Sequence, residues 1–326
     1  AGLERGDWIM KVDTSYISKK YETYLLQGTK AVKLTLGEWK EVEIEDEEDG
    51  NEGGDGEDEG PTMEYRVVPI DDPVEMPAAQ IVEDNPVHKY EIIESPVKKI
   101  RVGYLMYNSF TAGTKAEPEK YNNELRSVSQ KFKEAGVQAV ILDLRYNEGG
   151  SMDCVQLLGT ILTSADRLGE PMAYLEYNDK NTDKDATILF GTDREINLNL
   201  HSLIAITSGT TMGAPEMLIR SLFLEDTYPI ATVGSSTKGQ NVATEQFINE
   251  EFLWSVNPVV CTVYNSQHDT YGAISPATDL KISETTIDKS TNYSEFLPFG
   301  TFDKDGKSER LLKIAIGVLD GTYPPK

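Results

Sequence analysis

The second part of the chain alternates short apolar runs with polar stretches that carry apolar residues at helical spacing. Residues 137–144 are almost continuously apolar, as in a strand buried on both faces. Residues 117–135 are polar, with apolar positions that suit an amphipathic helix. The same patterns predict further strands at 99–110, 172–177, 203–207 and 230–233 and further helices at 152–162, 215–223 and 309–319. Strands and helices in this order predict an α/β core with a largely parallel sheet.

The first seventy residues follow a two-residue period instead. A glycine-bracketed turn precedes residues 8–13, whose apolar and polar side chains alternate between two faces as in a strand. A short helix is predicted at 18–27, followed by a hairpin whose strands begin at 32 and return over 63–70.

These patterns divide the chain into three parts. Residues 1–71 are predicted to form a β-rich module. Residues 72–97 are rich in Pro, Asp and Glu with little periodicity, and they predict a linker or a cap laid over the core. Residues 98–326 are then the α/β core.

An acidic insert interrupts the predicted hairpin. Residues 41–60 contain twelve Asp and Glu and no Lys or Arg, so about half of the net charge of -24 lies in this insert. The insert has too few apolar residues to offset the entropy lost on ordering, and it is predicted to be a solvated loop. Its acidic residues do not follow the spacing of a calcium-binding loop. The sign of the charge also disfavours nucleic acid as a partner.

Composition narrows the kinds of functional site that the chain could contain. No apolar run approaches the ~18 residues that a membrane span needs, so no transmembrane segment is predicted. Two cysteines, Cys154 and Cys261, are too few for a disulfide framework and do not match metal-ligand spacing. The histidines His88, His201 and His268 are scattered, and no phosphate-binding or dinucleotide motif occurs. We therefore predict no cofactor and no metal.

Residues 141–150, ILDLRYNEGG, place a glycine turn after a predicted buried strand. Backbone N–H groups are thereby expected at the carboxyl end of a sheet, where α/β proteins place their sites. The segment resembles the D-L-R-x-N-x-G-G signature of the C-terminal-processing, or tail-specific, serine peptidases of the S41 type. That resemblance implies that the amide of Gly149 or Gly150 pairs with the amide of Ala214 to hold the oxyanion. It also implies a fold related to the ClpP and crotonase proteins.

Two further segments resemble the two halves of that family's serine and lysine site. Residues 205–216, AITSGTTMGAPE, align with a turn of the form T-A-S-A-S-E, in which the serine position is Gly213. Residues 233–242, VGSSTKGQNV, align with V-G-E-x-T-x-G-K, in which the lysine position is Gln240. Glycine has no side chain that could attack a carbonyl carbon, and a glutamine amide is not a base at physiological pH. The aligned site therefore lacks both the nucleophile and the base.

Two alternatives stay open at this point. Lys238 lies 25 residues after Gly213, which is the usual separation of the serine and the lysine in the family, so Lys238 is a second candidate for the base. The alignment on Gln240 instead requires a two-residue insertion around 225–229. The nearby hydroxyls of Ser208, Thr210 and Thr211 are candidates for a relocated nucleophile.

The amino-terminal pattern resembles the middle of a PDZ domain, so 1–71 is predicted to be a partial PDZ-like module. We predict an inactive S41 homologue, a pseudoenzyme, that binds extended peptides or protein C-termini. The alternative is an active serine endopeptidase that cuts near protein C-termini. The family resemblance also implies a location outside the cytoplasm, in the periplasm or cell envelope, as an exported or lipid-anchored protein.

Overall fold

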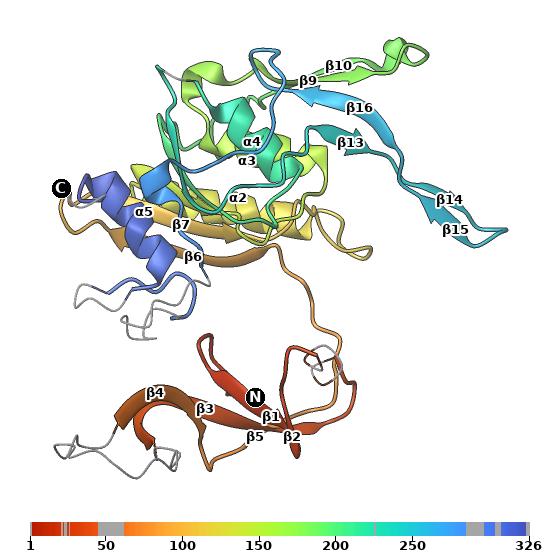
Figure 1. The fold of residues 1–326 in the computed structure, drawn as a ribbon. Coiled ribbons are helices and arrows are strands. Elements are labelled where there is room, and N and C mark those ends of the chain that lie inside the picture. Colours follow the sequence, from red (N-terminus) through yellow and green to blue (C-terminus); the bar gives the residue numbers. More distant parts are fainter. Residues whose placement is uncertain are drawn as a thin grey trace, which may run out of the picture. The chain divides into compact units, whose positions relative to one another are not determined.

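The computed structural model describes residues 2–20, 22, 25, 27–44, 62–224, 226–284, 297–303 and 308–323. The chain forms two compact units (Figure 1), one made of Ala1–Glu83 with Lys289–Pro298 and the other of Asp84–Asp288 with Phe299–Lys326. We call them the N-terminal unit and the core unit. Positions 21, 23, 24 and 26 of the predicted helix at 18–27 and residues 45–60 of the acidic insert lie outside the described residues.

The N-terminal unit is β-rich, as predicted. Its sheet has the strand order β2-β1-β3-β4, with β5 paired to β3, and every pairing is antiparallel. The strands are β1 (Trp8–Val12), β2 (Ser15–Tyr16), β3 (Val32–Ile44), β4 (Thr62–Pro69) and β5 (Val74–Met76). β3 and β4 are the predicted hairpin. The PDZ-like interpretation stays a prediction.

The core unit is built around a five-stranded sheet of order β12-β11-β8-β7-β6. Its strands are β6 (Val87–Glu94), β7 (Arg101–Tyr107), β8 (Ala139–Asp143), β11 (Leu203–Thr207) and β12 (Ile230–Gly234). The last four run parallel to one another, and β6 is an antiparallel edge strand. Every residue of β8 and β11 is buried, which explains their continuous apolar sequence.

A second sheet of the core unit is antiparallel, with the order β10-β9-β16-β13. Its strands are β9 (Pro171–Tyr177), β10 (Ala186–Leu189), β13 (Val242–Thr244) and β16 (Val259–Tyr264). The prediction of a largely parallel sheet therefore describes only the central sheet, and the core as a whole is mixed. The physical reason is the short connection between β9 and β10, because parallel strands need a longer crossover.

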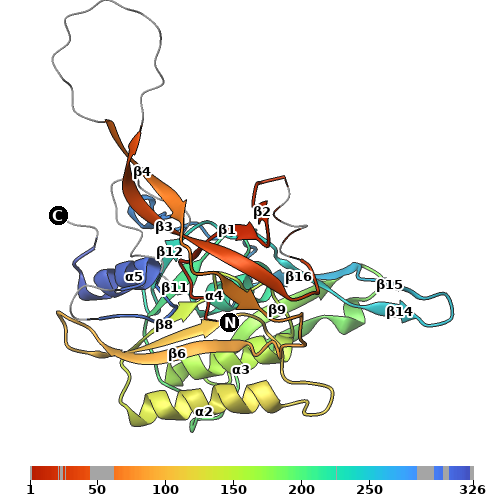
Figure 2. The same cartoon turned by 90° about the horizontal axis from the view of Figure 1, so that it is seen from below.

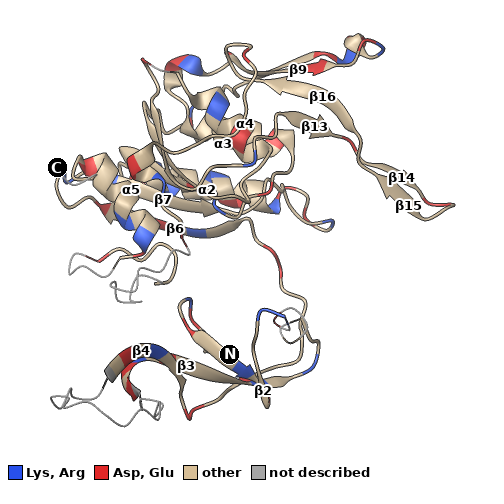
Figure 3. Ribbon diagram, in the orientation of Figure 1, with Lys and Arg blue, Asp and Glu red and all other residues tan. Residues whose placement is uncertain are grey.

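The strands β14 (Phe247–Asn249) and β15 (Trp254–Val256) form a separate hairpin between β13 and β16. This arm projects from the core unit in Figure 1 and carries acidic but no basic residues in Figure 3. The sequence analysis did not predict it, because its apolar residues are exposed and follow no burial pattern.

Part of the predicted linker is sheet. Residues 72–97 contain β5 and the edge strand β6, so the interpretation of this segment as a linker or cap is wrong for 87–94. An edge strand carries few buried residues, and β6 exposes His88, Lys89, Ile92 and Glu94 to solvent. The polar composition of β6 explains why the sequence analysis did not predict it as a strand.

Helices cover both faces of the central sheet. They are α2 (Lys120–Glu134), α3 (Met152–Leu162), α4 (Ala214–Leu222) and α5 (Arg310–Asp320), with short 3-10 turns at Ala165–Arg167, Thr182–Lys184 and Thr278–Leu280. α2, α3 and α4 share one hydrophobic cluster, and α5 packs in a second cluster with the other face of the sheet. Figure 2 shows α2 and α3 side by side. Among the described residues, no helix is both long enough and apolar enough to cross a membrane.

Candidate active site

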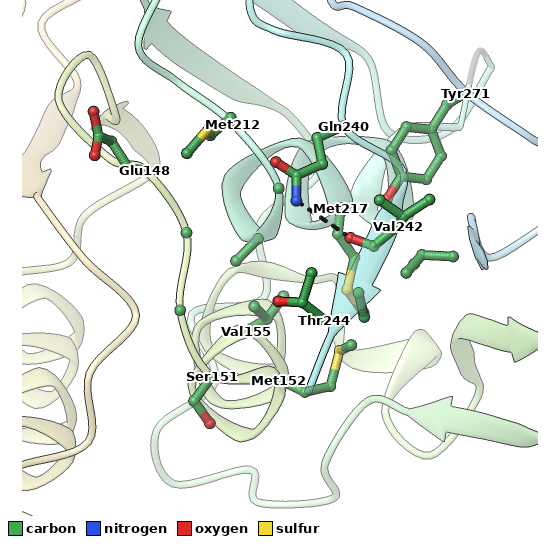
Figure 4. Close-up of a pocket in the computed structure, with 16 residues that line it drawn as sticks. Glu148, Ser151, Met152, Val155, Met212, Met217, Gln240, Val242, Thr244 and Tyr271 are labelled. Carbon is green, nitrogen blue, oxygen red and sulfur yellow. Dashed lines mark hydrogen bonds between the residues drawn. The ribbon is translucent and has the colours of Figure 1, made fainter. Parts of the chain in front are cut away.

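A pocket of about 480 Å³ opens where the loops after β8 and β11 meet strand β13 (Figure 4). The carboxyl ends of parallel strands meet at one edge of a sheet, so these loops come together although they are far apart in sequence. The lining comes from residues 148–152 and Val155, 212–214 and Met217, and 240 and 242–244, with Val263 and Tyr271. The lining includes the predicted site residues Gly149, Gly150, Gly213, Ala214 and Gln240, but not Lys238.

Gly213 faces Gln240 across the pocket. A Cβ atom added to Gly213 would lie 3.8 Å from Cδ of Gln240, within ordinary van der Waals contact. The side chain of Lys238 is exposed, and its backbone N–H donates to the carbonyl of Thr211. The residue opposite the serine position is therefore Gln240.

The backbone at Gly213 has φ +71° and ψ -111°, a conformation that glycine adopts readily and other residues rarely. Gly213 is the N-cap residue of α4, directly before Ala214. Nothing blocks a side chain at this position, so a serine here would have room but would carry backbone strain.

Two backbone amides near Gly213 can donate to a ligand. Ala214 is the first residue of α4, so its N–H has no partner within the helix. The N–H of Gly149 donates to Oδ1 of Asn147 at 3.0 Å. The carbonyl of Gly149 accepts from the N–H of Phe110, and the N–H of Ser151 donates to the carbonyl of Phe110. Because backbone groups alternate in direction along an extended segment, the N–H of Gly150 points away from Phe110. Gly150, rather than Gly149, is therefore the glycine donor that remains available.

Only glycine fits the backbone at position 150. A Cβ there would lie 2.3 Å from the carbonyl oxygen of Phe110, and φ is +137°. A Cβ on Gly149 would lie 3.7 Å from the nitrogen of Ala214, which shows how closely the glycine turn approaches the start of α4.

The buried carboxylate of Glu216 ties the loop that carries Gln240 to the start of α4. It accepts hydrogen bonds from the backbone N–H groups of Gly213 at 2.9 Å, Gly239 at 2.6 Å and Gln240 at 2.8 Å, and from the hydroxyl of Thr237. Its side chain is fully buried, and four donors satisfy it without a basic partner. These bonds keep Gln240 opposite Gly213.

Asp143 and Arg145, directly before the glycine turn, belong to a buried network of ion pairs. The guanidinium group of Arg145 is buried and bonds to Asp143 at 2.6 Å, to Glu309 at 2.9 Å and to Glu284 at 3.0 Å. Burial alone would lower the pKa of Arg145, but the charges of Asp143 and Glu309 raise it, so the group stays charged. The hydroxyl of Tyr104 donates to Asp143 at 2.8 Å, and burial followed by that charge raises the pKa of Tyr104.

The three hydroxyls considered as relocated nucleophiles point elsewhere. Thr210 donates to the carbonyl of Arg145 at 2.7 Å, as does Ser208, and Thr211 donates to the carbonyl of Leu144 at 2.8 Å. None of them lines the pocket. They hold the loop after β11 against the loop after β8.

The described lining of the pocket contains no basic side chain that could take the role of the family's lysine. Among the described residues of its lining, the hydroxyls belong to Ser151, Thr244 and Tyr271, and none of the side chains is Lys, Arg or His. Burial raises the pKa of Tyr271, so its phenol stays protonated at neutral pH. No group of three potential metal ligands occurs in the described part of the chain.

Comparison with known proteins identifies the family. The model of peptidase family S41 matches residues 101–257. A Bacteroides fragilis protein assigned to the S41 proteases has a crystal structure that matches 98% of this chain and 74% of its own, with 36% sequence identity and a TM-score of 0.79. The chain belongs to peptidase family S41.

Two further solved structures resemble the chain weakly. The photosystem II D1 C-terminal processing protease matches with 16% identity over 86% of this chain and 64% of its own, at a TM-score of 0.47. A lipoprotein from Streptococcus agalactiae matches with 19% identity over 58% of this chain and 63% of its own, at a TM-score of 0.42. A search of curated protein sequences gives no match.

Within this S41 chain, sequence reasoning missed two features of the site. The first is Glu216, although G-x-x-E before an apolar helix is a capping pattern that could have indicated it. The second is the apolar wall formed by Met152, Met217 and Val242, which are far apart in sequence and carry no motif.

Proposed function

We propose that this S41 chain binds extended peptides and does not cleave them. One observation supports the proposal above all: the positions that align with the family's serine and lysine hold Gly213 and Gln240, and these two residues face each other across the pocket.

Peptide cleavage by the mechanism of this family needs both a serine hydroxyl and a lysine base. A serine hydroxyl becomes a nucleophile only when a neighbouring base takes its proton. By analogy with deletions in other serine peptidases, loss of either partner lowers the rate by roughly 10⁴–10⁶, and loss of both costs little more. Among its described residues, the pocket lining contains no Lys or His that could activate one of its hydroxyls.

The retained surface suits a peptide. Met152, Met217 and Val242 provide an apolar wall for a side chain. β13 is the last strand of its sheet in the described structure and lines the pocket. The backbone groups of residues 241 and 243 face β16, so those of Val242 face the open edge, where an extended peptide could add as a strand.

Two further proposals rest on family resemblance. The N-terminal unit would act as a PDZ-like module, since its turn, strand and hairpin occur in the expected order. The protein would work outside the cytoplasm, where proteins of this family usually act. Expression with cell fractionation tests the location, and a peptide titration of the isolated N-terminal unit tests the module.

A paired assay tests the central proposal. Purified protein is incubated with an unstructured protein that has an apolar C-terminus, and mass spectrometry follows fragments while fluorescence anisotropy follows binding of a labelled peptide. We expect binding without fragments. Thr244→Trp, which fills the mouth of the pocket, should abolish binding, whereas Thr187→Trp on the exposed face of β10 should not. Cleavage in proportion to protein concentration would refute the proposal, as would equal binding by both variants.

A further inference from the structure

We infer that the site binds the free carboxylate at the end of a peptide, with one carboxylate oxygen in the space that Gly213 leaves open. This inference rests on the proposed function, because it specifies which part of a peptide the site holds.

The empty volume lies next to hydrogen-bond donors. A Cβ on Gly213 would approach nothing more closely than the Gln240 side chain, at 3.8 Å, so the space of a serine side chain is vacant. Ala214 directly follows Gly213, and a Cβ on Gly149 would lie 3.7 Å from the nitrogen of Ala214, so the glycine turn and the start of α4 meet near this space. Gln240 Nε2 makes only a long contact of 3.5 Å to the carbonyl of Val242, which a bound acceptor could replace (Figure 4).

A carboxylate uses these donors better than an internal peptide bond does. The carbonyl carbon of an internal residue carries one oxygen, which the amides of Gly150 and Ala214 can bind. A terminal carboxylate carries two oxygens, so the second oxygen can occupy the vacant volume and accept a hydrogen bond from Gln240. In an active member of the family, the serine side chain would occupy this position.

The charges around the site tolerate an anion. The first turns of α3 and α4 both border the pocket, and helix N-termini carry partial positive charge. Glu148 is exposed and lies at the far side of the pocket from Gln240 in Figure 4, so solvent screens it. The carboxylate of Glu216 is already satisfied by four donors.

The position of the carboxylate also sets the preferred last residue. When the carboxylate oxygens lie between Gly150, Ala214 and Gln240, the side chain of the last residue faces the apolar wall. That wall consists of Met152, Met217 and Val242. We therefore expect peptides that end in a large aliphatic residue such as leucine to bind best.

The test compares two forms of one peptide. An octapeptide that ends in leucine, labelled with fluorescein at its N-terminus, is prepared with a free carboxylate and with a C-terminal amide. Anisotropy titrations with the full chain should show the free acid binding about tenfold or more tightly, since charge-assisted hydrogen bonds are lost in the amide. Equal affinity would overturn the inference but leave the proposed function intact. Binding of neither form would refute the proposed function itself.

A variant pair locates the carboxylate. Gln240→Glu keeps the shape of the side chain but adds a negative charge, so affinity for the free acid should fall about tenfold or more while affinity for the amide changes little. Gln130→Glu, on the exposed face of α2, adds the same charge outside the pocket and should change neither. If Gln240→Glu weakens both peptides equally, or neither, the carboxylate does not lie beside Gln240 and the inference is wrong.

Discussion

At the scale of single residues, the proposed function depends on the chemistry of two positions. Gly213 and Gln240 keep the relative placement expected of a nucleophile and its base, but neither can transfer a proton or attack a carbonyl. Glu216, which bonds to the backbone of both residues, is fully buried. The proposed function therefore needs the architecture of the pocket but not the chemistry of a serine and a lysine.

Gly213→Ser should destabilise the protein by about 1–2 kcal/mol, because a residue with a Cβ is strained at positive φ. Urea denaturation measures the change in the free energy of unfolding. Gly209→Ser is the control, since Gly209 is exposed, does not have positive φ and has open space around its Cα. Equal effects of the two substitutions would contradict the described backbone at Gly213.

Glu216→Gln should cost about 2–4 kcal/mol in the free energy of unfolding, because the new amide nitrogen would face backbone N–H groups that it cannot accept from. It should also weaken peptide binding, since the loop of Gln240 loses its anchor. Glu170→Gln, at an exposed carboxylate, serves as the control. A stable Glu216→Gln protein with unchanged peptide affinity would show that these hydrogen bonds do not position the loop.

At the scale of elements, α5 holds the loops of the core unit at both of its ends. Glu309 caps its N-terminus by accepting from the N–H of Leu312 and also bonds to Arg145. At the other end, the carboxylate of Asp320 accepts from the N–H groups of Val97 and Lys98, each at 3.0 Å, in the turn between β6 and β7. The last predicted helix therefore connects the edge of the central sheet with the glycine turn of the site.

Asp320 should give the protein a measurable pH dependence. Burial alone would raise its pKa, but the N–H groups of Lys98 and Val97, the Ser95 hydroxyl and the charge of Lys98 lower it below the ordinary value. A lowered folded-state pKa stabilises the protein above the unfolded value of about 4, and this stabilisation disappears as pH falls through the folded value.

Asp320→Asn should therefore reduce the free energy of unfolding by about 1–2 kcal/mol at pH 7, and the difference should shrink below about pH 4. Urea denaturation over a pH series measures it, with the exposed Asp179→Asn as control. A deficit that stays constant from pH 7 to below pH 3 would show that the carboxylate charge is not its source.

At the scale of the whole molecule, the two units differ in the size of their cores. Among the described residues of Ala1–Glu83, the buried apolar side chains are Val12 and Leu34, whereas the core unit contains two extensive clusters. Since apolar burial is the main stabilising term, the N-terminal unit should be the less stable of the two.

Two spectroscopic probes can separate the units. Two of the three tryptophans, Trp8 and Trp39, lie in the N-terminal unit, whereas α2 to α5 lie in the core unit. We predict that tryptophan fluorescence changes at lower urea concentration than the helical circular dichroism signal. Trp254→Phe removes the tryptophan of the arm and should sharpen the separation. Superimposable transitions would mean that the two units unfold together.

Sequence alone predicted the elements whose patterns follow from full burial or helical periodicity. The runs that became β8 and β11 are apolar because both faces of these strands are covered, and α3 and α5 show their buried face in their spacing. The edge strand β6 and the arm were missed because partial exposure removes that signal.

The site was predicted only where a motif marked it. Residues 205–216 and 233–242 indicated the two halves, but counting along the chain could not decide between Lys238 and Gln240, since the answer depends on the path of the intervening loop. Three bonds to Glu216, from Thr237, Gly239 and Gln240, fix that path, and they join residues more than twenty positions apart. The Met-lined wall depends in the same way on the packing of several elements.

The central claim is that the pocket contains no activated nucleophile, and covalent trapping tests it most directly. The intact mass of the full chain is measured after incubation with an alkyl fluorophosphonate, beside a known serine peptidase in the same reaction. The account predicts labelling of the peptidase and no change in the mass of this chain. A stoichiometric adduct on any residue that lines the pocket would contradict it.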